Sequence, residues 1–498
     1  MTEQKTETYS EEDFRFASGN AESKDRKPQT KPVGYFRDAW RRFKKNKASI
    51  VALCIIVFLI LFAFITPLCS TFDVSFSDPI YRNRIPKNSV LAHIGIATGT
   101  YEKSINSRAY DYYAGIGIGA SYDRDTDTED NGAAVGSTYA AIRSIKGTSD
   151  SKTSVKMDAY YEIGFETLSV TQAEYNRIVA YEEETGNIVL YPMIDSTLSY
   201  DSSDADYWYL VDSSTGCALL DGDGNYQDAY LRDSDGNVVY SMARDATGLS
   251  IRVLYYEYFV YANGTVPEFL FGSNTVGQDI LARLASGIQL SLLLAFSVSV
   301  INLFIGAVYG MIEGYYGGAV DLVMERIVDI LAGLPFIVVA TLFQMHFANT
   351  AGVIPSLLFA FVLTGWISTA GRVRTQFYRF KGQEYVLAAR TLGASDRRLM
   401  LHHIFPNTLG TLITSSVLVI PNVIFSESML SYLGIVNLNG TAVTSLGTML
   451  SDGQAVLSSY PHVILFPALV ISLLMISFNL FGNGLRDAFN PSLRGTEE

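Results

Sequence analysis

The chain has 498 residues, 17% of them charged and 48% hydrophobic, and its mean hydropathy is +0.18. Soluble proteins carry about 25% charged residues, so the composition disfavours a purely soluble protein. The net charge of -13 is unevenly spread, because residues 71–270 hold 30 Asp and Glu against 14 Lys and Arg, and 22 of the 31 Tyr. We therefore expect an acidic, tyrosine-rich block inside an apolar, mildly basic protein.

The sequence contains none of the common metal or nucleotide motifs. C-x-x-C, H-E-x-x-H and G-x-x-x-x-G-K-[ST] are all absent, and the three cysteines, Cys54, Cys69 and Cys217, form no disulfide framework. The chain is therefore predicted to bind no metal or other cofactor of its own. If ATP drives this protein, another chain hydrolyses the ATP.

The N-terminal region changes character twice. Residues 1–34 are polar and of mixed charge, which predicts a flexible tail. In residues 35–47, Phe36, Trp40 and Phe43 are spaced by four and three, with basic residues on the other faces. This spacing is typical of an amphipathic helix at a membrane interface.

Six membrane-spanning helices are predicted. The 23 uncharged residues of 48–70 would extend about 34 Å as a helix, enough to cross a bilayer. Five more spans are expected within residues 271–492, at about 285–312, 321–346, 352–371, 408–434 and 461–484. The predicted fold class is an α-helical polytopic membrane protein with an inserted domain.

Charge next to the spans predicts the orientation. Segment 35–47 has six basic residues and one acidic residue, and segment 372–407 has seven basic and two acidic residues. Positive charge marks cytoplasmic segments, and four predicted spans separate these two, which places both on the cytoplasmic side. Both termini, including residues 493–498, are then expected to be cytoplasmic and residues 71–270 extracellular.

The predicted extracellular block has the pattern of a β-rich domain. Alternating apolar and polar stretches are separated by turn signals, among them two D-x-D-G-N strings that begin at Asp221 and Asp233. Calcium loops need glycine at their sixth position, where this chain has Tyr226 and Val238. We therefore favour hairpin turns over metal sites.

Segment 372–407 contains the main candidate site. Small residues followed by a glycine predict a short helix that ends in a sharp turn, either presented to a partner or resting on lipid headgroups. The candidate residues are Glu384, Leu387, Ala388, Ala389, Arg390, Gly393, Ala394, Phe405 and Pro406.

This segment resembles the EAA loop of ABC-importer permeases, in which a proline follows the loop glycine after thirteen residues, as Pro406 follows Gly393. Specifically, the chain is similar to the C-type subunit of oligopeptide and dipeptide importers. The glutamate of the pattern is Leu387 here, and Glu384 lies about one helical turn earlier. Further motifs of that family match at 38–43, 277–284, 314–318, 427–434 and 485–491.

The resemblance implies a type I ABC-importer permease that imports peptides by alternating access and catalyses no reaction itself. Its partners would be a second homologous permease subunit in a heterodimer, two ABC ATPases, and an extracellular peptide-binding protein or lipoprotein, in contact with membrane lipid and without nucleic acid. The alternative cargo is a nickel chelate or another small solute. A membrane sensor with an extracellular ligand domain is the other alternative.

Two acidic residues, Asp329 and Glu427, lie in or near the predicted spans. Charge is costly in a membrane, so such groups often face a pathway. The hypothesis that they line or gate the pathway competes with simple capping or pairing near the membrane surfaces, which we favour. His402 and His403 are interpreted as interfacial residues rather than metal ligands.

Overall fold

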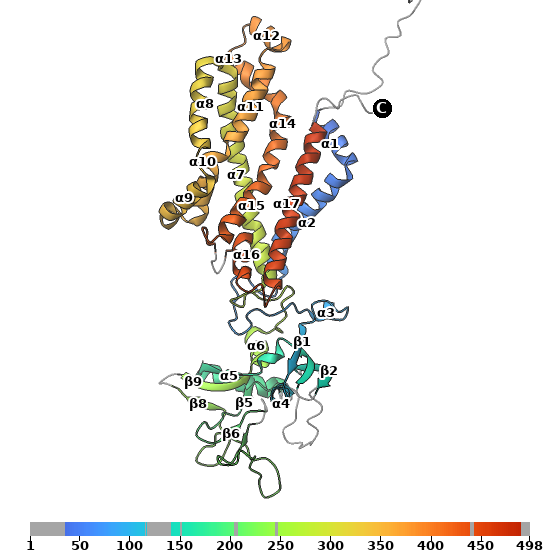
Figure 1. The fold of residues 1–498 in the computed structure, drawn as a ribbon, viewed down its shortest axis with the longest axis vertical. Coiled ribbons are helices and arrows are strands. Elements are labelled where there is room, and N and C mark those ends of the chain that lie inside the picture. The colour runs from blue at the N-terminus through green and yellow to red at the C-terminus, as the bar shows by residue number, and fades with distance from the viewer. Residues whose placement is uncertain are drawn as a thin grey trace, which may run out of the picture.

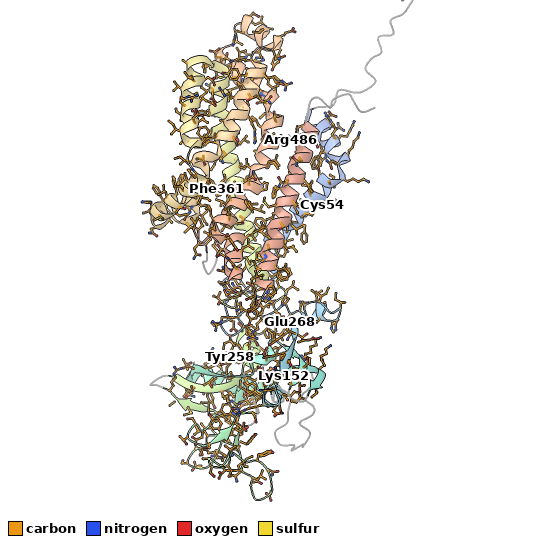
Figure 2. All side chains as sticks on the ribbon, viewed as in Figure 1. Cys54, Lys152, Tyr258, Glu268, Phe361 and Arg486 are labelled. Atoms are coloured by element: carbon orange, nitrogen blue, oxygen red, sulfur yellow. The ribbon has the colours of Figure 1, made fainter. Side chains whose placement is uncertain are left out.

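The computed structural model describes residues 35–114, 116, 141–149, 152–203, 208–244, 248–438 and 443–489. The predicted tails, 1–34 and 493–498, lie outside the described residues. Two bodies follow one another along the longest axis, a helical body and a mixed body of strands and helices (Figure 1). Cys54, Phe361 and Arg486 lie in the helical body, and Lys152, Tyr258 and Glu268 lie in the mixed body (Figure 2).

The helical body is formed by the two ends of the described chain. Its helices are α1 (Tyr35–Lys45), α2 (Lys47–Cys69), α7 (Ile280–Tyr316), α8 (Gly318–Ala332), α9 (Phe336–Ala351), α10 (Val353–Gly365), α11 (Ile367–Phe380), α12 (Glu384–Thr391), α13 (Asp396–Arg398), α14 (Phe405–Val417), α15 (Val419–Tyr432), α16 (Leu446–Gln454) and α17 (His462–Phe489). A π-helical turn, Leu399–Ile404, joins α13 to α14.

Five helical stretches of the described chain are long and apolar enough to cross a membrane, and a sixth is added if the bent pair α8 and α9 counts as one span. The expected third span, 321–346, therefore differs from a single straight helix. The axis turns by 74° between α8 and α9. Pro335 lies at this break, and its ring removes a backbone donor and bends the chain.

The mixed body contains three antiparallel sheets within the described residues. The first has the strand order β1-β3-β2, the second has β4-β9-β5 with β8 also paired to β9, and the third joins β6 and β7. The strands are β1 (Thr100–Ile105), β2 (Ile142–Ser149), β3 (Lys152–Asp158), β4 (Phe165–Thr171), β5 (Leu190–Tyr191), β6 (Tyr200–Asp201), β7 (Tyr209–Leu210), β8 (Ser241–Ala243) and β9 (Gly248–Leu254).

Helices interrupt these sheets, so the block expected to be β-rich is mixed in its described part. They are α3 (Ser89–Ala92), α4 (Ser107–Ala114), the 3-10 turn η4 (Tyr161–Ile163), α5 (Gln172–Thr185) and α6 (Tyr255–Asn263). Tyr161, Tyr191 and Leu254 are buried together in one apolar cluster of this body, which joins the two larger sheets through their side chains.

The two D-x-D-G-N strings form tight turns. The Asp221 carboxylate accepts hydrogen bonds from the backbone N–H groups of Asp223 and Asn225, at 2.9 and 2.8 Å. The Asp233 carboxylate accepts the equivalent pair of bonds at 2.9 Å each. Antiparallel bridges flank both turns, as expected for short hairpins.

Polar contacts join the mixed body to the helices. The Asp78 carboxylate accepts hydrogen bonds from the hydroxyl of Tyr255 on α6, at 2.8 and 2.7 Å. The carbonyl oxygen of Asp78 lies where a side chain at Gly277 would be placed, 1.7 Å from an ideal Cβ. Asp279 then begins α7 by accepting a hydrogen bond from the backbone of Leu281 at 3.0 Å.

Within the helical body, α7 approaches α11 across three glycines spaced by four residues. An ideal Cβ on Gly306 would lie 2.7 Å from a side-chain atom of Thr369, and one on Gly310 would lie 2.2 Å from the carbonyl oxygen of Ala370. A Cβ on Gly314 would lie 2.7 Å from Phe377. Membrane helices use such small-residue spacing to bring their backbones into contact.

We expect Gly310→Ala to separate α7 from α11, because the added methyl group overlaps a backbone oxygen. The free energy of unfolding should fall by about 1–3 kcal/mol, as is typical of overpacked cores. Gly371→Ala is the matched control, since an added Cβ there meets nothing within 4 Å. Thermal unfolding in detergent should show a lower midpoint for Gly310→Ala alone, and equal midpoints would contradict this interpretation of the packing.

Candidate functional site

The predicted loop helix is present as α12, and its ends are defined by local chemistry. Gln383 precedes the helix in an extended conformation, and Glu384 lies in the first turn, where a negative charge suits the helix dipole. At the other end Gly393 has a φ of +85°, and its N–H donates to the carbonyl of Arg390 at 3.0 Å. The Ala394 N–H donates to the Ala389 carbonyl at 3.1 Å. Glycine is favoured here because side chains destabilise a positive φ.

One face of α12 is anchored and the other is open. Val386 is fully buried in a cluster with Phe377 and Leu399. Glu384 is exposed, Leu387 is 46% exposed and Leu392 is 88% exposed. Of the remaining candidates, Ala389, Ala394 and Phe405 are half-buried, whereas Ala388, Arg390, Gly393 and Pro406 are exposed. One face of the helix therefore packs against the protein through Val386, and Leu387 and Leu392 form an exposed apolar edge.

Hydrogen bonds connect this loop to the end of α7. The Tyr315 hydroxyl donates to the Asp396 carboxylate at 2.5 Å and accepts from the Arg390 guanidinium at 3.1 Å. The Lys381 ammonium donates to the carbonyl oxygen of Gly314 at 3.0 Å. Segments on both sides of α12 thus contact the same turn of α7.

Arg374 on α11 forms the centre of a second polar cluster. Its guanidinium contacts Asp321 through two hydrogen bonds, of 2.6 and 2.9 Å, and Glu325 at 3.1 Å. Glu313 on α7 lies 3.4 Å away and is 1% exposed. The Tyr378 hydroxyl donates to Asp321 at 2.8 Å. These ion pairs and hydrogen bonds connect α8 to α7 and α11.

Glu427 lies inside the helical body. It is 1% exposed, and its carboxylate accepts hydrogen bonds from Ser291 at 3.3 Å and from Ser431 at 3.1 Å. Because Glu427 belongs to α15 and Ser291 to α7, their hydrogen bond joins these two helices. A role of Glu427 in gating stays a prediction.

Asp329 and the two histidines have simpler surroundings. Asp329 is exposed on α8 and forms an ion pair with Arg326 at 2.7 Å, one helical turn away. His402 is exposed and His403 is half-buried in the π-helical turn. None of the three belongs to a cluster of potential metal ligands among the described residues, where Glu313, Asp321 and Glu325 form such a group around Arg374.

The sequence interpretation did not select Tyr315 or Arg374. A signal was present for Glu313 alone, because a carboxylate in the long apolar helix α7 needs a partner, but the sequence does not indicate that Arg374 is this partner. For Tyr315, the sequence indicated only that the residue follows the glycines of α7. Its two partners lie 75 and 81 residues away in sequence, so no local pattern indicates them.

Comparison with known proteins identifies the family. Residues 306–495 match the family described as binding-protein-dependent transport system inner membrane component, and residues 34–86 match the N-terminal TM domain of oligopeptide transport permease C. The oligopeptide transport system permease protein OppC of Bacillus subtilis is 41% identical over 45% of this chain and 72% of the relative. The dipeptide permease proteins DppC of Lactococcus lactis and Bacillus subtilis are 37% and 39% identical, over 47% and 45% of this chain and 67% and 69% of the relatives.

The chain therefore belongs to the inner membrane components of binding-protein-dependent transport systems. It is a multi-pass, non-catalytic permease subunit of the ABC transporter class, in the branch of the oligopeptide and dipeptide permeases. Permeases of this family pair with another permease and with ATPase subunits. The long mixed body lies between the two matched regions.

We expect Arg374→Met to destabilise the helical body, because it leaves Asp321, Glu325 and Glu313 close together without a cation. The free energy of unfolding should fall by roughly 2 kcal/mol or more, because the remaining carboxylates lose their positively charged partner. Arg372→Met is the control, at an exposed position on the same helix. A lower midpoint of thermal unfolding is expected for Arg374→Met only, and an unchanged midpoint would show that the cluster adds no stability.

Proposed function

We propose that the chain is the permease subunit of an ATP-driven importer of peptides in the bacterial cytoplasmic membrane. The observation that carries this proposal is the match to peptide permeases, of which OppC of Bacillus subtilis is 41% identical over 72% of its length. In this proposal the substrate passes by alternating access between this chain and a second, homologous permease. Two partner ATPases bind ATP and Mg, and an extracellular binding protein or lipoprotein delivers the peptide.

The arrangement of the two bodies supports the proposed orientation. Helix α1 and the loop helices α12 and α13 lie at the end of the helical body that is far from the mixed body (Figure 1). These segments contain the basic residues that mark a cytoplasmic side. We therefore propose that both termini are cytoplasmic and that residues 71–270 are extracellular.

The exposed edge of α12 supports a role in coupling to the ATPases. Leu392 is 88% exposed at the tip of the loop, and Glu384 and Leu387 lie one turn apart on the helix. An exposed apolar side chain at such a tip favours binding of a partner, because the partner removes the side chain from water. We propose that an ATPase groove takes this edge and that its movement reaches α7 through Tyr315.

The face formed by α8 and α9 supports contact with the partner permease and with lipid. None of the side chains of α8 in the described structure is buried, and Leu322, Val323 and Ile330 are 60% or more exposed. In a bilayer such apolar side chains are covered by lipid or by another helix. Helix α8 also contains Asp329, and its ion pair with Arg326 supports pairing near a membrane surface rather than a place in the pathway.

We expect Leu392→Asp to abolish retention of the ATPases while leaving the fold intact, because the side chain packs against little of this chain. The measurement is co-purification of tagged chain from detergent-solubilised membranes, followed by mass spectrometry. Lys45→Asp, an exposed change on α1, is the control and should retain the ATPases. Recovery of no ATPase with the wild-type chain would contradict the transporter proposal and favour the sensor.

Substrate class has a separate test. Cells that lack this chain should lose uptake of radiolabelled dipeptides and oligopeptides, and expression of the chain should restore it. Uptake of a nickel chelate serves as the comparison and should not change. Unaltered peptide uptake in the deletion strain, with loss of chelate uptake, would overturn the peptide assignment and leave the permease assignment in place.

A further inference from the structure

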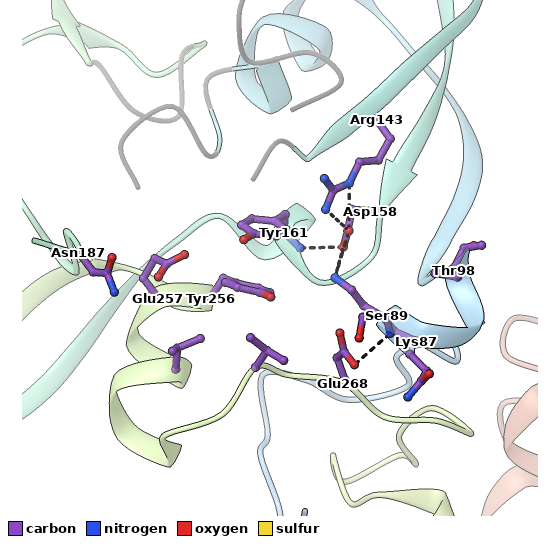
Figure 3. A pocket seen from close by; sticks show the side chains of 14 residues that line it. Lys87, Ser89, Thr98, Arg143, Asp158, Tyr161, Asn187, Tyr256, Glu257 and Glu268 are labelled. Carbon is purple, nitrogen blue, oxygen red and sulfur yellow. Dashed lines mark hydrogen bonds and ion pairs between the residues drawn. The ribbon is translucent and has the colours of Figure 1, made fainter. Parts of the chain in front are cut away.

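The mixed body contains a cavity that the transport role does not explain. Its volume is about 530 Å³, within the usual range for small-molecule sites. Residues of the loop before α3, the end of β3, the turn η4 and α6 line it. Figure 3 shows Glu257 and Asn187 toward one end, Tyr161 and Tyr256 in the middle, and Lys87 with Asp158 toward the other end.

Glu257 is the unusual residue of this cavity. It is 7% exposed, and no hydrogen bond or ion pair to its carboxylate is found among the described residues that surround it. It lies in the first turn of α6, where the helix dipole stabilises negative charge. A buried carboxylate without a partner destabilises the folded protein, and a bound cation removes this destabilisation.

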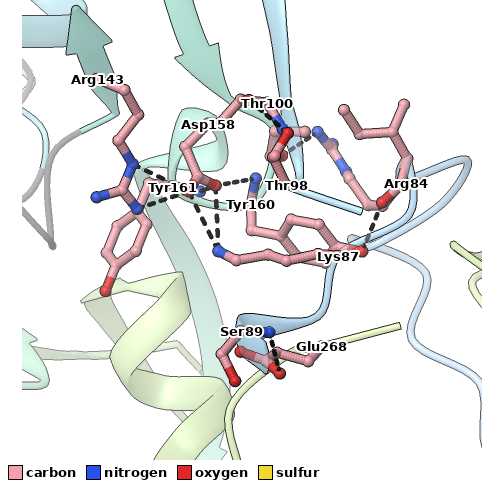
Figure 4. Close-up of polar contacts among 12 residues, drawn as sticks. Arg84, Lys87, Ser89, Thr98, Thr100, Arg143, Asp158, Tyr160, Tyr161 and Glu268 are labelled. Carbon is pink, nitrogen blue, oxygen red and sulfur yellow. Dashed lines mark hydrogen bonds and ion pairs between the residues drawn. The ribbon is translucent and has the colours of Figure 1, made fainter. Parts of the chain in front are cut away.

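The opposite end of the cavity holds charged groups that are already paired with one another. The Asp158 carboxylate is shared by two cations, Lys87 at 3.2 Å and Arg143 at 2.6 Å (Figure 4). Glu268 lines the same end and accepts a hydrogen bond from the Ser89 N–H at 3.0 Å, so two cations here face two carboxylates. The Lys87 ammonium also lies over the rings of Tyr160, Tyr161 and Tyr256, at 4.9, 5.5 and 5.5 Å, which orders this end.

We propose that this cavity binds a small ammonium compound, with its ammonium group on the Glu257 carboxylate. A metal ion fits less well, because calcium takes six to eight oxygen ligands and Glu257 offers a single carboxylate between tyrosine rings and valines. An ammonium group instead needs one carboxylate and neighbouring aromatic faces. The site is separate from the membrane pathway and does not depend on the proposed cargo.

Burial gives Glu257 a pH dependence that serves the test. Loss of hydration raises the pKa of Glu257 to about 7. The carboxylate is therefore ionised, and able to bind an ammonium group, only above about pH 7. The titratable or charged groups that share the cavity are Lys87, Arg143, Asp158, Tyr161, Tyr256 and Glu268.

The experiment is equilibrium dialysis of radiolabelled L-alanyl-L-alanine against the full chain in detergent, without ATP or partner subunits. We expect saturable binding that weakens from pH 8 to pH 6. Glu257→Gln should weaken binding about tenfold or more, as expected for loss of a charged hydrogen bond. N-acetylated dialanine, which has no ammonium group, should bind as weakly to the wild-type chain as dialanine binds to Glu257→Gln.

Glu183→Gln is the matched control, because Glu183 is exposed on α5 in the same body and should leave binding unchanged. Glu257→Gln should also raise the midpoint of thermal unfolding at pH 8, since the folded state no longer buries an unpaired charge. Absence of saturable dialanine binding at millimolar concentration, or equal binding by Glu257→Gln, would overturn the proposal. Because the assay involves no transport, either result is independent of whether the chain imports peptides.

Discussion

The close approach of α7 and α11 across Gly306, Gly310 and Gly314 is the constraint on which the rest of the helical body depends. Without a Cβ at these positions the two backbones meet, and the side chains beyond the glycines are brought within bonding distance. Arg374 can reach Glu313 only because Gly314 lies beside the backbone of Arg374. The apolar contact in the middle of the helices therefore sets the geometry of the charged cluster at their end.

Helix α7 connects the features of both ends of the helical body. Its last turn contains Tyr315, which bonds the loop segments around α12, and its interior contains Ser291, which bonds Glu427. Its first turn is capped by Asp279, next to the contact between Gly277 and Asp78. A rigid helix of 37 residues is a suitable element for passing movement between the loop and the mixed body.

The sequence predicted the features that depend on neighbours along the chain. The spans follow from uncharged runs, and α12 with its Gly393 turn follows from residue type and spacing. The bend between α8 and α9 was missed because Pro335 stands inside a continuous apolar run, where composition alone suggests one helix. The Arg374 cluster could not be predicted either, since Arg374 pairs with residues 49 to 61 positions away, and only tertiary packing selects those partners.

The same limit explains why the Glu257 cavity has no signature in the sequence. Lys87 and Asp158 are 71 residues apart, and Glu257 lies almost a hundred residues further on. The structure places Lys87, Asp158 and Glu257 around the same cavity of the mixed body. Glu257 and Tyr255 are two residues apart on α6, and the Tyr255 hydroxyl bonds Asp78, whose carbonyl packs against Gly277 before α7. A displacement of the first turn of α6 would therefore disturb the contact at the start of α7, because the Tyr255–Asp78 hydrogen bond and the Asp78–Gly277 contact connect the two helices.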